Sequence, residues 1–352
     1  MRTESLNRLA CPAPGCAGHL TTLPSFEPAY DGPGEILEAI LVCGRCGADF
    51  PVLLGVALLE DDLGTYLGTF WPEIEACAAE LCGAGISAEM RSYIGIPDSE
   101  QAGDLRWTVS PYLQAHFDPG SLGDDFDEGW WRDAIEAHRA GGRDPYTVLL
   151  AAARDRSGKP RAGLAFDVGT SVGRGAAELA LVYPYAVGVD RSFRAILAAR
   201  RHLLGAPSPL TEYLLETEKG NWETRTLPPV KPAGNLDFVV ASGGALPAAA
   251  GSASCVAALN VLCAVREPVA LLDDFARVLE PGGLLLVSSP FWSDPSEGAE
   301  TPLATGGPEF LHTALAPAFE IVREEDGVPW LLRVAKRRWD VYLCHCLAAT
   351  RR

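Results

Sequence analysis

The sequence predicts an α/β protein whose C-terminal half forms a doubly wound parallel sheet that ends in an antiparallel hairpin. After residue 160, apolar runs bounded by Gly, Pro or Asp alternate with helix-like stretches, the pattern of strands joined by crossover helices. The last two runs have no full helix between them, which favours an antiparallel pair at the sheet edge. The predicted strands cover residues 163–168, 185–189, 236–241, 253–259, 284–288, 319–323 and 339–348, and the predicted helices cover 173–183, 192–204 and 267–279.

The chain of 352 residues is long enough for two or three domains. Residues 1–62 contain four clustered cysteines and end in an apolar run closed by three acidic residues. Residues 63–160 are typical of helices and loops, with apolar residues at helical spacing over 66–82 and 130–138. We expect a helical lid there, followed by the sheet domain over residues 161–352.

Charge and composition argue against several classes of function. The net charge is −17, from 46 acidic and 29 basic side chains, which argues against a nucleic-acid partner because phosphate binding depends on Lys and Arg. No apolar run reaches the roughly 18 to 20 residues of a membrane helix. The N-terminus lacks the apolar core of a signal peptide. We therefore expect a cytoplasmic protein with reduced thiols; its oligomeric state is not predicted.

Four of the ten cysteines have the spacing of metal ligands. Gly and Pro in the two cysteine knuckles allow tight turns, so that four thiolates can complete a closed tetrahedral site. A first unit of this size buries little core, and structural Zn²⁺ would stabilise it. The alternative is that these cysteines are small buried hydrophobes. The predicted ligands are Cys11, Cys16, Cys43 and Cys46, whereas Cys77, Cys82, Cys255, Cys263, Cys344 and Cys346 lie in apolar segments and are expected in the core.

The sequence around these knuckles, from Leu9-Ala-Cys-Pro to Gly55-Val-Ala-Leu-Leu, resembles a known zinc-ribbon domain. That small domain activates some RNA and protein methyltransferases, and a similar zinc module is fused to bacterial methyltransferases. The resemblance covers about residues 6 to 60. The first knuckle departs from it, because four residues rather than two separate Cys11 from Cys16.

A strand, a glycine turn and a helix over residues 163–180 predict a nucleoside-cofactor site. The turn carries Asp167, Gly169 and Gly173, and the next strand ends at Asp190, whose carboxylate can accept both ribose hydroxyl hydrogens. This arrangement fits dinucleotides as well as S-adenosylmethionine. The carboxylate of Asp167 favours S-adenosylmethionine, because it suits an ammonium and a sulfonium and would repel a pyrophosphate.

Together with the Pro281-Gly-Gly283 turn before the fifth strand, these features resemble class I methyltransferases over residues 161–352. The resemblance implies a Rossmann-like, seven-stranded sheet with S-adenosylmethionine as cofactor. It implies that Asp167, Gly169 and Gly173 hold the methionine end and that Asp190 holds the ribose. Thr170, Arg191, Ser242 and Asn260 are further candidate cofactor contacts, with Ser242 standing where the family often has an acid near the adenine.

A finer pattern concerns the methyl acceptor. Leu259-Asn260, Ser289-Pro290-Phe291 and Val328-Pro-Trp330 resemble motifs in the methyltransferase domain of ovothiol synthases and, more distantly, in protein-histidine methyltransferases. The resemblance implies an imidazole nitrogen as acceptor. Asn260, at the end of strand four, is a candidate catalytic residue that could orient an acceptor nitrogen toward the methyl group. Alternatively, Asn260 only caps the following helix.

Other candidates lie outside these motifs. Tyr112 and His116 are four residues apart and could share a helical face that looks into the site, with His116 as a general base or, more commonly for such a histidine, a structural residue. Trp130 and Trp131 could wall a pocket or pack in the core. The triplet 344–346, Cys-His-Cys, alternates within a strand, which favours core packing over metal binding. The basic run 336–338 is expected to be a solvated turn.

The sequence as a whole predicts an S-adenosylmethionine-dependent methyltransferase acting on a nitrogen, imidazole or amine, of a small molecule or peptide. One alternative is an RNA methyltransferase that docks its substrate through the zinc ribbon, which would require a large basic patch. Another is a non-catalytic, partner-binding protein whose cofactor site has decayed, as Ser242 and Ala253-Ser254 suggest.

Overall fold

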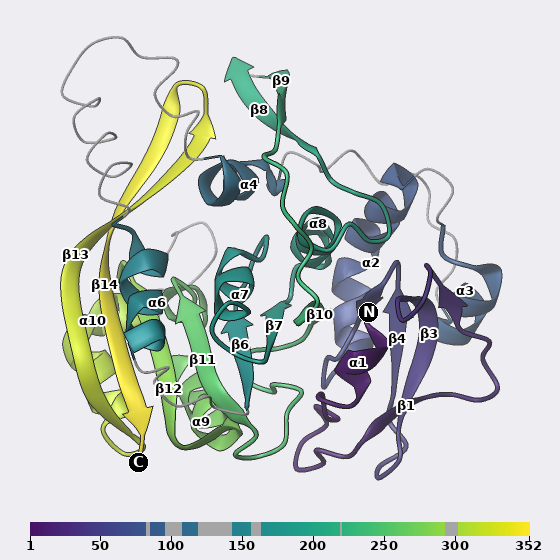
Figure 1. Ribbon diagram of the computed structural model, residues 1–352, viewed down its shortest axis with the longest axis horizontal. Coiled ribbons are helices and arrows are strands. Elements are labelled where there is room, and N and C mark those ends of the chain that lie inside the picture. Colours follow the sequence, from purple (N-terminus) through teal and green to yellow (C-terminus); the bar gives the residue numbers. More distant parts are fainter. Residues whose placement is uncertain (82–84, 96–107, 119–142, 156–162, 219, 293–301) are drawn as a thin grey trace.

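The computed structural model describes residues 1–81, 85–95, 108–118, 143–155, 163–218, 220–292 and 302–352 (Figure 1). Cys82, the predicted helix at 130–138 and the pair Trp130–Trp131 lie outside the described residues. Among the helices described, none combines the length and the apolar character needed to cross a bilayer.

The centre of the molecule is a mixed sheet in the order β10-β7-β6-β11-β12-β14-β13. The first five strands of this order pair in parallel, and β14 is antiparallel to both of its neighbours. The α/β sheet with a C-terminal antiparallel hairpin is therefore confirmed. The strands are β6 (Leu164–Val168), β7 (Tyr185–Asp190), β10 (Leu236–Val240), β11 (Ala253–Leu259), β12 (Leu279–Ser289), β13 (Phe319–Ala335) and β14 (Arg338–Arg351).

The order of the strands reverses between β6 and β11. From β6 the chain builds outward through β7 and β10, and it then returns to the other side of β6 to form β11 and β12. In open α/β sheets, ligands bind beyond the carboxyl ends of the strands at this point. The topology therefore brings the end of β6, with the predicted glycine turn, beside the end of β11, with Asn260.

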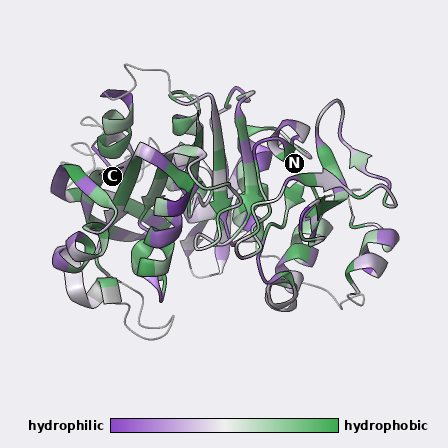
Figure 2. Cartoon of the chain, turned by 90° about the horizontal axis from the view of Figure 1, so that it is seen from below, coloured by the Kyte–Doolittle hydropathy of each residue, from purple (hydrophilic) through white to green (hydrophobic). Residues whose placement is uncertain are grey.

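Helices cover both faces of the sheet (Figure 1). One apolar cluster joins the sheet to α6 (Pro145–Asp155), α7 (Arg174–Leu179) and α8 (Phe193–Leu203). A second cluster joins the opposite face to α9 (Pro268–Val278) and α10 (Pro302–Leu315). Because both faces are covered, the parallel strands are apolar at nearly every position, and hydrophobic colouring runs along them in Figure 2.

The N-terminal unit is a small antiparallel sheet that docks on the edge strand β10. Leu58 forms a parallel bridge with Val240, and the Leu59 N–H donates to the Val240 carbonyl at 2.7 Å. The unit consists of α1 (Thr3–Leu6), β1 (Leu20–Thr22), β2 (Ala29–Tyr30), β3 (Ile36–Cys43), β4 (Asp49–Leu53) and β5 (Val56–Ala57).

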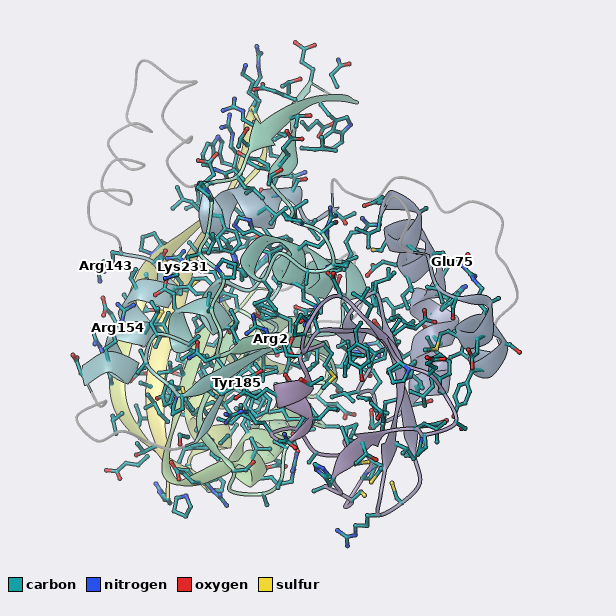
Figure 3. The ribbon with its side chains drawn as sticks, turned by 45° about the vertical axis from the view of Figure 1, so that its right-hand side comes forward. Arg2, Glu75, Arg143, Arg154, Tyr185 and Lys231 are labelled. Atoms are coloured by element: carbon teal, nitrogen blue, oxygen red, sulfur yellow. The ribbon has the colours of Figure 1, made fainter. Side chains whose placement is uncertain are left out.

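Buried ion pairs fasten this unit to the large sheet. Arg200 of α8 pairs with both Asp237 of β10 and Glu35 of the N-terminal unit, and both Arg200 and Asp237 are fully buried. Beside them the Ser5 hydroxyl hydrogen-bonds with the Tyr185 hydroxyl at 2.9 Å, in the region where Figure 3 labels Arg2 and Tyr185. Removing one partner of such a pair typically costs about 3–5 kcal/mol, so the seam holds the two units in a fixed relation.

The described helices of the middle region do not form one continuous lid. The helix α2 (Leu63–Glu80) is preceded by Asp62, whose carboxylate accepts a capping hydrogen bond from the Thr65 N–H at 3.1 Å, and the helix packs on α8. The helix α3 (Ala88–Ile94) lies against the N-terminal unit, where the hydroxyl of Ser87 donates to Glu38. The helix α4 (Ser110–Phe117) contacts β13 and β8, and α6 covers the sheet. Only part of this helical region therefore lies over the sheet.

Two strand features were not predicted. A separate hairpin forms from β8 (Glu212–Glu218) and β9 (Asn221–Thr226), and β13 continues twelve residues past its predicted end, beside β8. The Lys336 N–H donates to the Glu216 carbonyl at 2.6 Å. Exposed acidic residues in β13 and exposed polar residues in β9 hide the apolar alternation on which strand prediction depends. The predicted turn over 336–338 is confirmed at Lys336 and Arg337, whereas Arg338 already begins β14.

Candidate active site and metal centre

Asp167 closes the turn between β6 and α7. Its carboxylate is 2% exposed, and its Oδ2 accepts hydrogen bonds from the Thr170 hydroxyl at 2.6 Å and from the Ala176 N–H at 2.8 Å. Burial raises the pKa of Asp167 to about 7, although these two hydrogen bonds work against the rise. Asp167 and Thr170 therefore fix the shape of the turn, and their direct contact with a cofactor stays a prediction.

The glycines of the turn are required by their surroundings. Gly169 has a φ of +67°, and a Cβ added there would lie 2.1 Å from Cγ2 of Val261. Gly173 has a φ of +93°, and a Cβ there would lie 2.7 Å from the ring of Phe238. Neither position accepts a side chain without rearrangement. The contact with Val261 places the predicted cofactor turn directly against the residue that follows Asn260.

Asp190 faces the same turn from the end of β7. Its carboxylate accepts hydrogen bonds from the Ser171 N–H and from the Ser192 N–H, each at 2.9 Å. Burial raises the pKa of Asp190, against the effect of backbone hydrogen bonds. The same carboxylate could accept a ribose hydroxyl. The structure thus brings Asp190 to the predicted turn.

Two other predicted cofactor contacts, Arg191 and Ser242, have protein partners outside the glycine turn. The side chain of Arg191 is 54% exposed and turns to Glu60 of the N-terminal unit, 3.5 Å away, so the structure does not bring it to the glycine turn. Ser242, after β10, accepts a hydrogen bond from the Gly244 N–H at 3.3 Å.

Glu60 was not predicted as a site residue. It is buried, and burial raises its pKa although Arg191 lowers it. The only sequence signal for it is its position at the end of the apolar run before residue 60.

Asn260 is held firmly at the end of β11. Its φ is +58°, its N–H donates to the Ser288 carbonyl at 2.9 Å, and its Oδ1 accepts from the Ser288 hydroxyl at 2.8 Å. The short helix that follows, Leu262–Ala264, has no side-chain cap, and the residue preceding α9 is Glu267. The capping role considered for Asn260 is therefore absent at both of these helices, and its carboxamide has a fixed orientation.

His116 lies in an aromatic enclosure. It is 6% exposed, and its ring centroid is 5.3 Å from that of Tyr146, 5.4 Å from that of Trp330 and 6.4 Å from that of Tyr112. Burial and then the charge of Arg174 lower the pKa of His116 to about 3, so its imidazole is neutral near pH 7. Its Nδ1 has no hydrogen-bond partner among the described residues. This setting favours a packing role for His116; its general-base role and the catalytic role of Tyr112 stay predictions.

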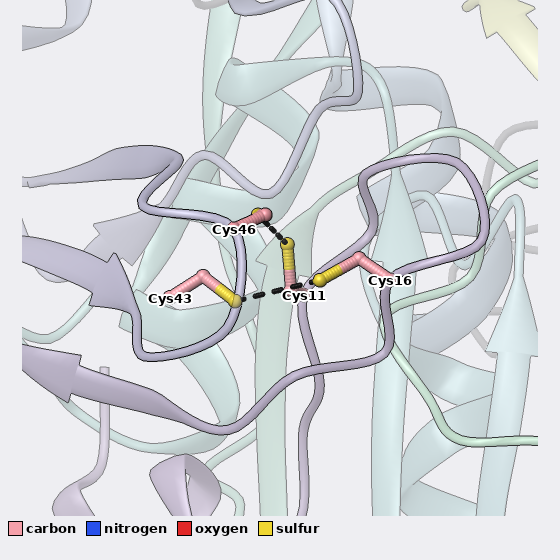
Figure 4. A group of neighbouring side chains, drawn as sticks. All are labelled: Cys11, Cys16, Cys43 and Cys46. Carbon is pink, nitrogen blue, oxygen red and sulfur yellow. Dashed lines mark hydrogen bonds between the residues drawn. The ribbon is translucent and has the colours of Figure 1, made fainter.

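The four predicted metal ligands converge at one point of the N-terminal unit (Figure 4). The Sγ atoms of Cys11 and Cys46 are 3.7 Å apart, and those of Cys16 and Cys43 are 3.6 Å apart. A tetrahedron with Zn–S bonds of about 2.3 Å has edges of about 3.8 Å, so the thiols have the spacing of a zinc site. A Cβ added at Gly18 would lie 2.5 Å from the Sγ of Cys43, so only glycine fits beside it. These residues could hold a metal ion.

The other described cysteines are buried and form no disulfide among the residues that the structure describes, as predicted for core residues. They are Cys77, Cys255, Cys263, Cys344 and Cys346. His345, between the last two, points to the opposite face of the strand as alternation requires, but it does not simply pack in the core. It contacts Glu324 and Asp326, an arrangement that the sequence did not reveal because these residues lie far from it in the chain.

Comparison with known proteins bears on the central sheet. A family model described as a methyltransferase domain matches residues 166–287, which run from β6 to β12 and include the turn, Asp190 and Asn260. No curated protein matches the chain.

Solved structures also resemble the chain, with limited overlap. The YcgJ protein from Bacillus subtilis is 13% identical, with 59% of this chain and 97% of that chain covered and a TM-score of 0.41. A complex between the Haloferax volcanii Trm112 methyltransferase activator and a putative methyltransferase is 14% identical, with 65% of this chain and 97% of that chain covered and a TM-score of 0.40. A SAM-dependent methyltransferase from Aquifex aeolicus is 15% identical, with 66% of this chain and 98% of that chain covered and a TM-score of 0.38. At these TM-scores the resemblances carry no argument about this chain.

The assignment therefore depends on the matched domain. That domain contains the glycine turn and both acidic strand ends found in the structure, and its family supports S-adenosylmethionine as the methyl donor. The chain is accordingly a methyltransferase, with its methyltransferase domain over residues 166–287.

Proposed function

We propose that this methyltransferase uses S-adenosylmethionine to methylate a nitrogen, imidazole or amine, of a small molecule or peptide. The observation that carries the proposal is the contact between Gly169 and Val261, because it makes the cofactor turn and Asn260 neighbours at one edge of the sheet. The net charge of −17 supports a small or peptide acceptor over RNA.

In this proposal the cofactor supplies an electrophilic methyl group on its sulfonium. Asp190, oriented by the N–H groups of Ser171 and Ser192, accepts the ribose hydroxyls. Asp167 holds Thr170 and the start of α7, so the turn keeps its shape before the cofactor arrives. A preorganised site of this kind loses less entropy on binding.

Asn260 orients the acceptor in the same proposal. Ser288 fixes the carboxamide, so Asn260 can hold an acceptor nitrogen with its lone pair in line with the methyl carbon. Methyl transfer is an in-line displacement, and positioning contributes much of its acceleration.

Replacing Asn260 separates this role from a purely conformational one. Its φ of +58° suits glycine but strains alanine. If the carboxamide serves the acceptor, Asn260→Gly and Asn260→Ala should both lose at least about a hundredfold in turnover while binding S-adenosylhomocysteine normally. The measurement is methyl transfer to a panel of imidazoles, amines and histidine peptides, followed by mass spectrometry. Wild-type turnover by Asn260→Gly would show that only the backbone conformation matters.

We also propose that the four cysteines hold one structural Zn²⁺. The ion would stabilise the knuckles of the unit that docks on β10. The double variant Cys43→Ser, Cys46→Ser should lose about one equivalent of zinc by metal analysis, because two of the four ligands are gone. Cys263→Ala, which removes a buried thiol elsewhere, should keep it. Full zinc content in the double variant would refute this assignment.

A further inference from the structure

A second group of possible metal ligands lies on the opposite side of the molecule from the cysteines. His312 comes from α10, Glu324 from β13 and His345 from β14. Their ligand atoms all lie within 4.8 Å of one another, although the residues come from three separate elements. Figure 1 shows these elements together at the C-terminal edge of the sheet, far from the N-terminal unit.

Both imidazoles point their Nε2 atoms at one carboxylate oxygen. Oε1 of Glu324 contacts Nε2 of His312 and lies 2.8 Å from Nε2 of His345. On the other side of the His345 ring, Nδ1 lies 3.2 Å from Oδ1 of Asp326. A proton on Nδ1 that is donated to Asp326 leaves the lone pair of Nε2 directed into the group. A carboxylate behind a histidine ligand fixes the tautomer in this way in metal sites.

Charge and exposure also fit a cation. With neutral imidazoles, Glu324 and Asp326 contribute two negative charges, which a divalent ion would balance. The side chain of His345 is 6% exposed, whereas those of Glu324 and His312 are 35% and 42% exposed. The group therefore has a buried, well-positioned base and an opening to solvent through which an ion can enter.

The group lies near the carboxyl ends of the parallel strands, where Asn260 follows β11. His345 pairs in register with Ser289 of β12, and the preceding Ser288 holds Asn260. The ring of Phe291 is 5.6 Å from that of His345, centroid to centroid. The group is thus close along the sheet to the position at which the acceptor is expected.

We propose that His312, Glu324 and His345 bind one divalent transition-metal ion such as Zn²⁺, with Asp326 supporting His345. Two imidazoles and a carboxylate are ligands that such ions accept. Unlike the four-cysteine site, three protein ligands leave coordination positions open for water or a small ligand. This site does not depend on the proposed acceptor.

The test uses Co²⁺ alone as the probe of the full chain carrying one equivalent of zinc, at the four cysteines, with the second site metal-free. Titration should show one added equivalent of Co²⁺ with visible d–d absorption and no thiolate-to-cobalt charge-transfer band, because its ligands are nitrogen and oxygen. His312→Ala and Glu324→Gln should each weaken this binding by more than about tenfold. Glu320→Gln, an exposed residue on the same strand, is the matched control and should bind as the wild type does.

Each outcome decides the question. His312 is exposed enough for its alanine variant to fold, which circular dichroism and unchanged binding of S-adenosylhomocysteine would verify. No added equivalent in the wild type, or wild-type affinity in both variants, would mean a hydrogen-bonded network only and would overturn the proposal. Failure to bind S-adenosylhomocysteine with Co²⁺ binding intact would count against the cofactor assignment alone.

Discussion

The cofactor side and the acceptor side of the sheet edge are built in different ways. On the cofactor side, one continuous segment from Asp167 to Asp190 supplies the turn and both carboxylates, and short backbone hydrogen bonds fix them. On the acceptor side, Asn260 is held by Ser288 and His116 packs on Trp330, partners that are distant in the chain and are brought together only by the fold. The cofactor side is therefore a local motif, whereas the acceptor side depends on tertiary packing.

The largest effect is expected from a side chain added to the local motif. Gly169→Ala should lower the free energy of unfolding by more than about 2 kcal/mol and abolish cofactor binding, because the new Cβ meets Val261 at a positive φ. Gly282→Ala is the matched control, since Gly282 has a φ of +74° but open space around it. Its cost should be only about 1 kcal/mol. Equal costs in urea unfolding would show that the contact with Val261 is unimportant.

A smaller effect is expected from one carboxylate of the motif. Asp190→Ala should raise the Kd for S-adenosylhomocysteine about tenfold, or about 1.4 kcal/mol, because the ribose hydroxyls lose their acceptor. Asp273→Ala, an exposed aspartate on α9, should leave the affinity unchanged. Calorimetric titration measures both, and an unchanged Kd in Asp190→Ala would assign the ribose to another residue.

The smallest effect is expected on the acceptor side, at His116. Its pKa of about 3 keeps the imidazole neutral from pH 5 to 8, so its protonation should not shape the rate in that range. His116→Phe preserves the aromatic packing and should change kcat by less than about threefold, with an unaltered pH–rate profile. A loss of about a hundredfold or more would instead identify His116 as a general base.

The same contrast explains what the sequence could predict. The strand at 253–259 and the acidic ends of β6 and β7 were predicted because apolar runs and glycine turns are local signals. The cysteine knuckles were recognised for the same reason. The seam of Arg200 with Asp237 and Glu35 could not be predicted, since these residues are far apart in the chain and only the fold brings them together. The group around His345 was missed because Glu324 and Asp326 lie beyond residue 323, the predicted end of their strand. The hairpin β8–β9 was missed because its exposed faces carry little apolar pattern.

The central claim is that the turn at Asp167 to Gly173 and Asp190 form a site for S-adenosylmethionine rather than for a dinucleotide. Calorimetric titration of the full chain with S-adenosylhomocysteine and, separately, with NADH tests it most directly. We predict saturable binding of one equivalent of S-adenosylhomocysteine and no measurable binding of NADH at pH 8, above the pKa of about 7 of Asp167, because its ionised carboxylate disfavours a pyrophosphate. Absence of S-adenosylhomocysteine binding, or tighter binding of NADH, would contradict the account.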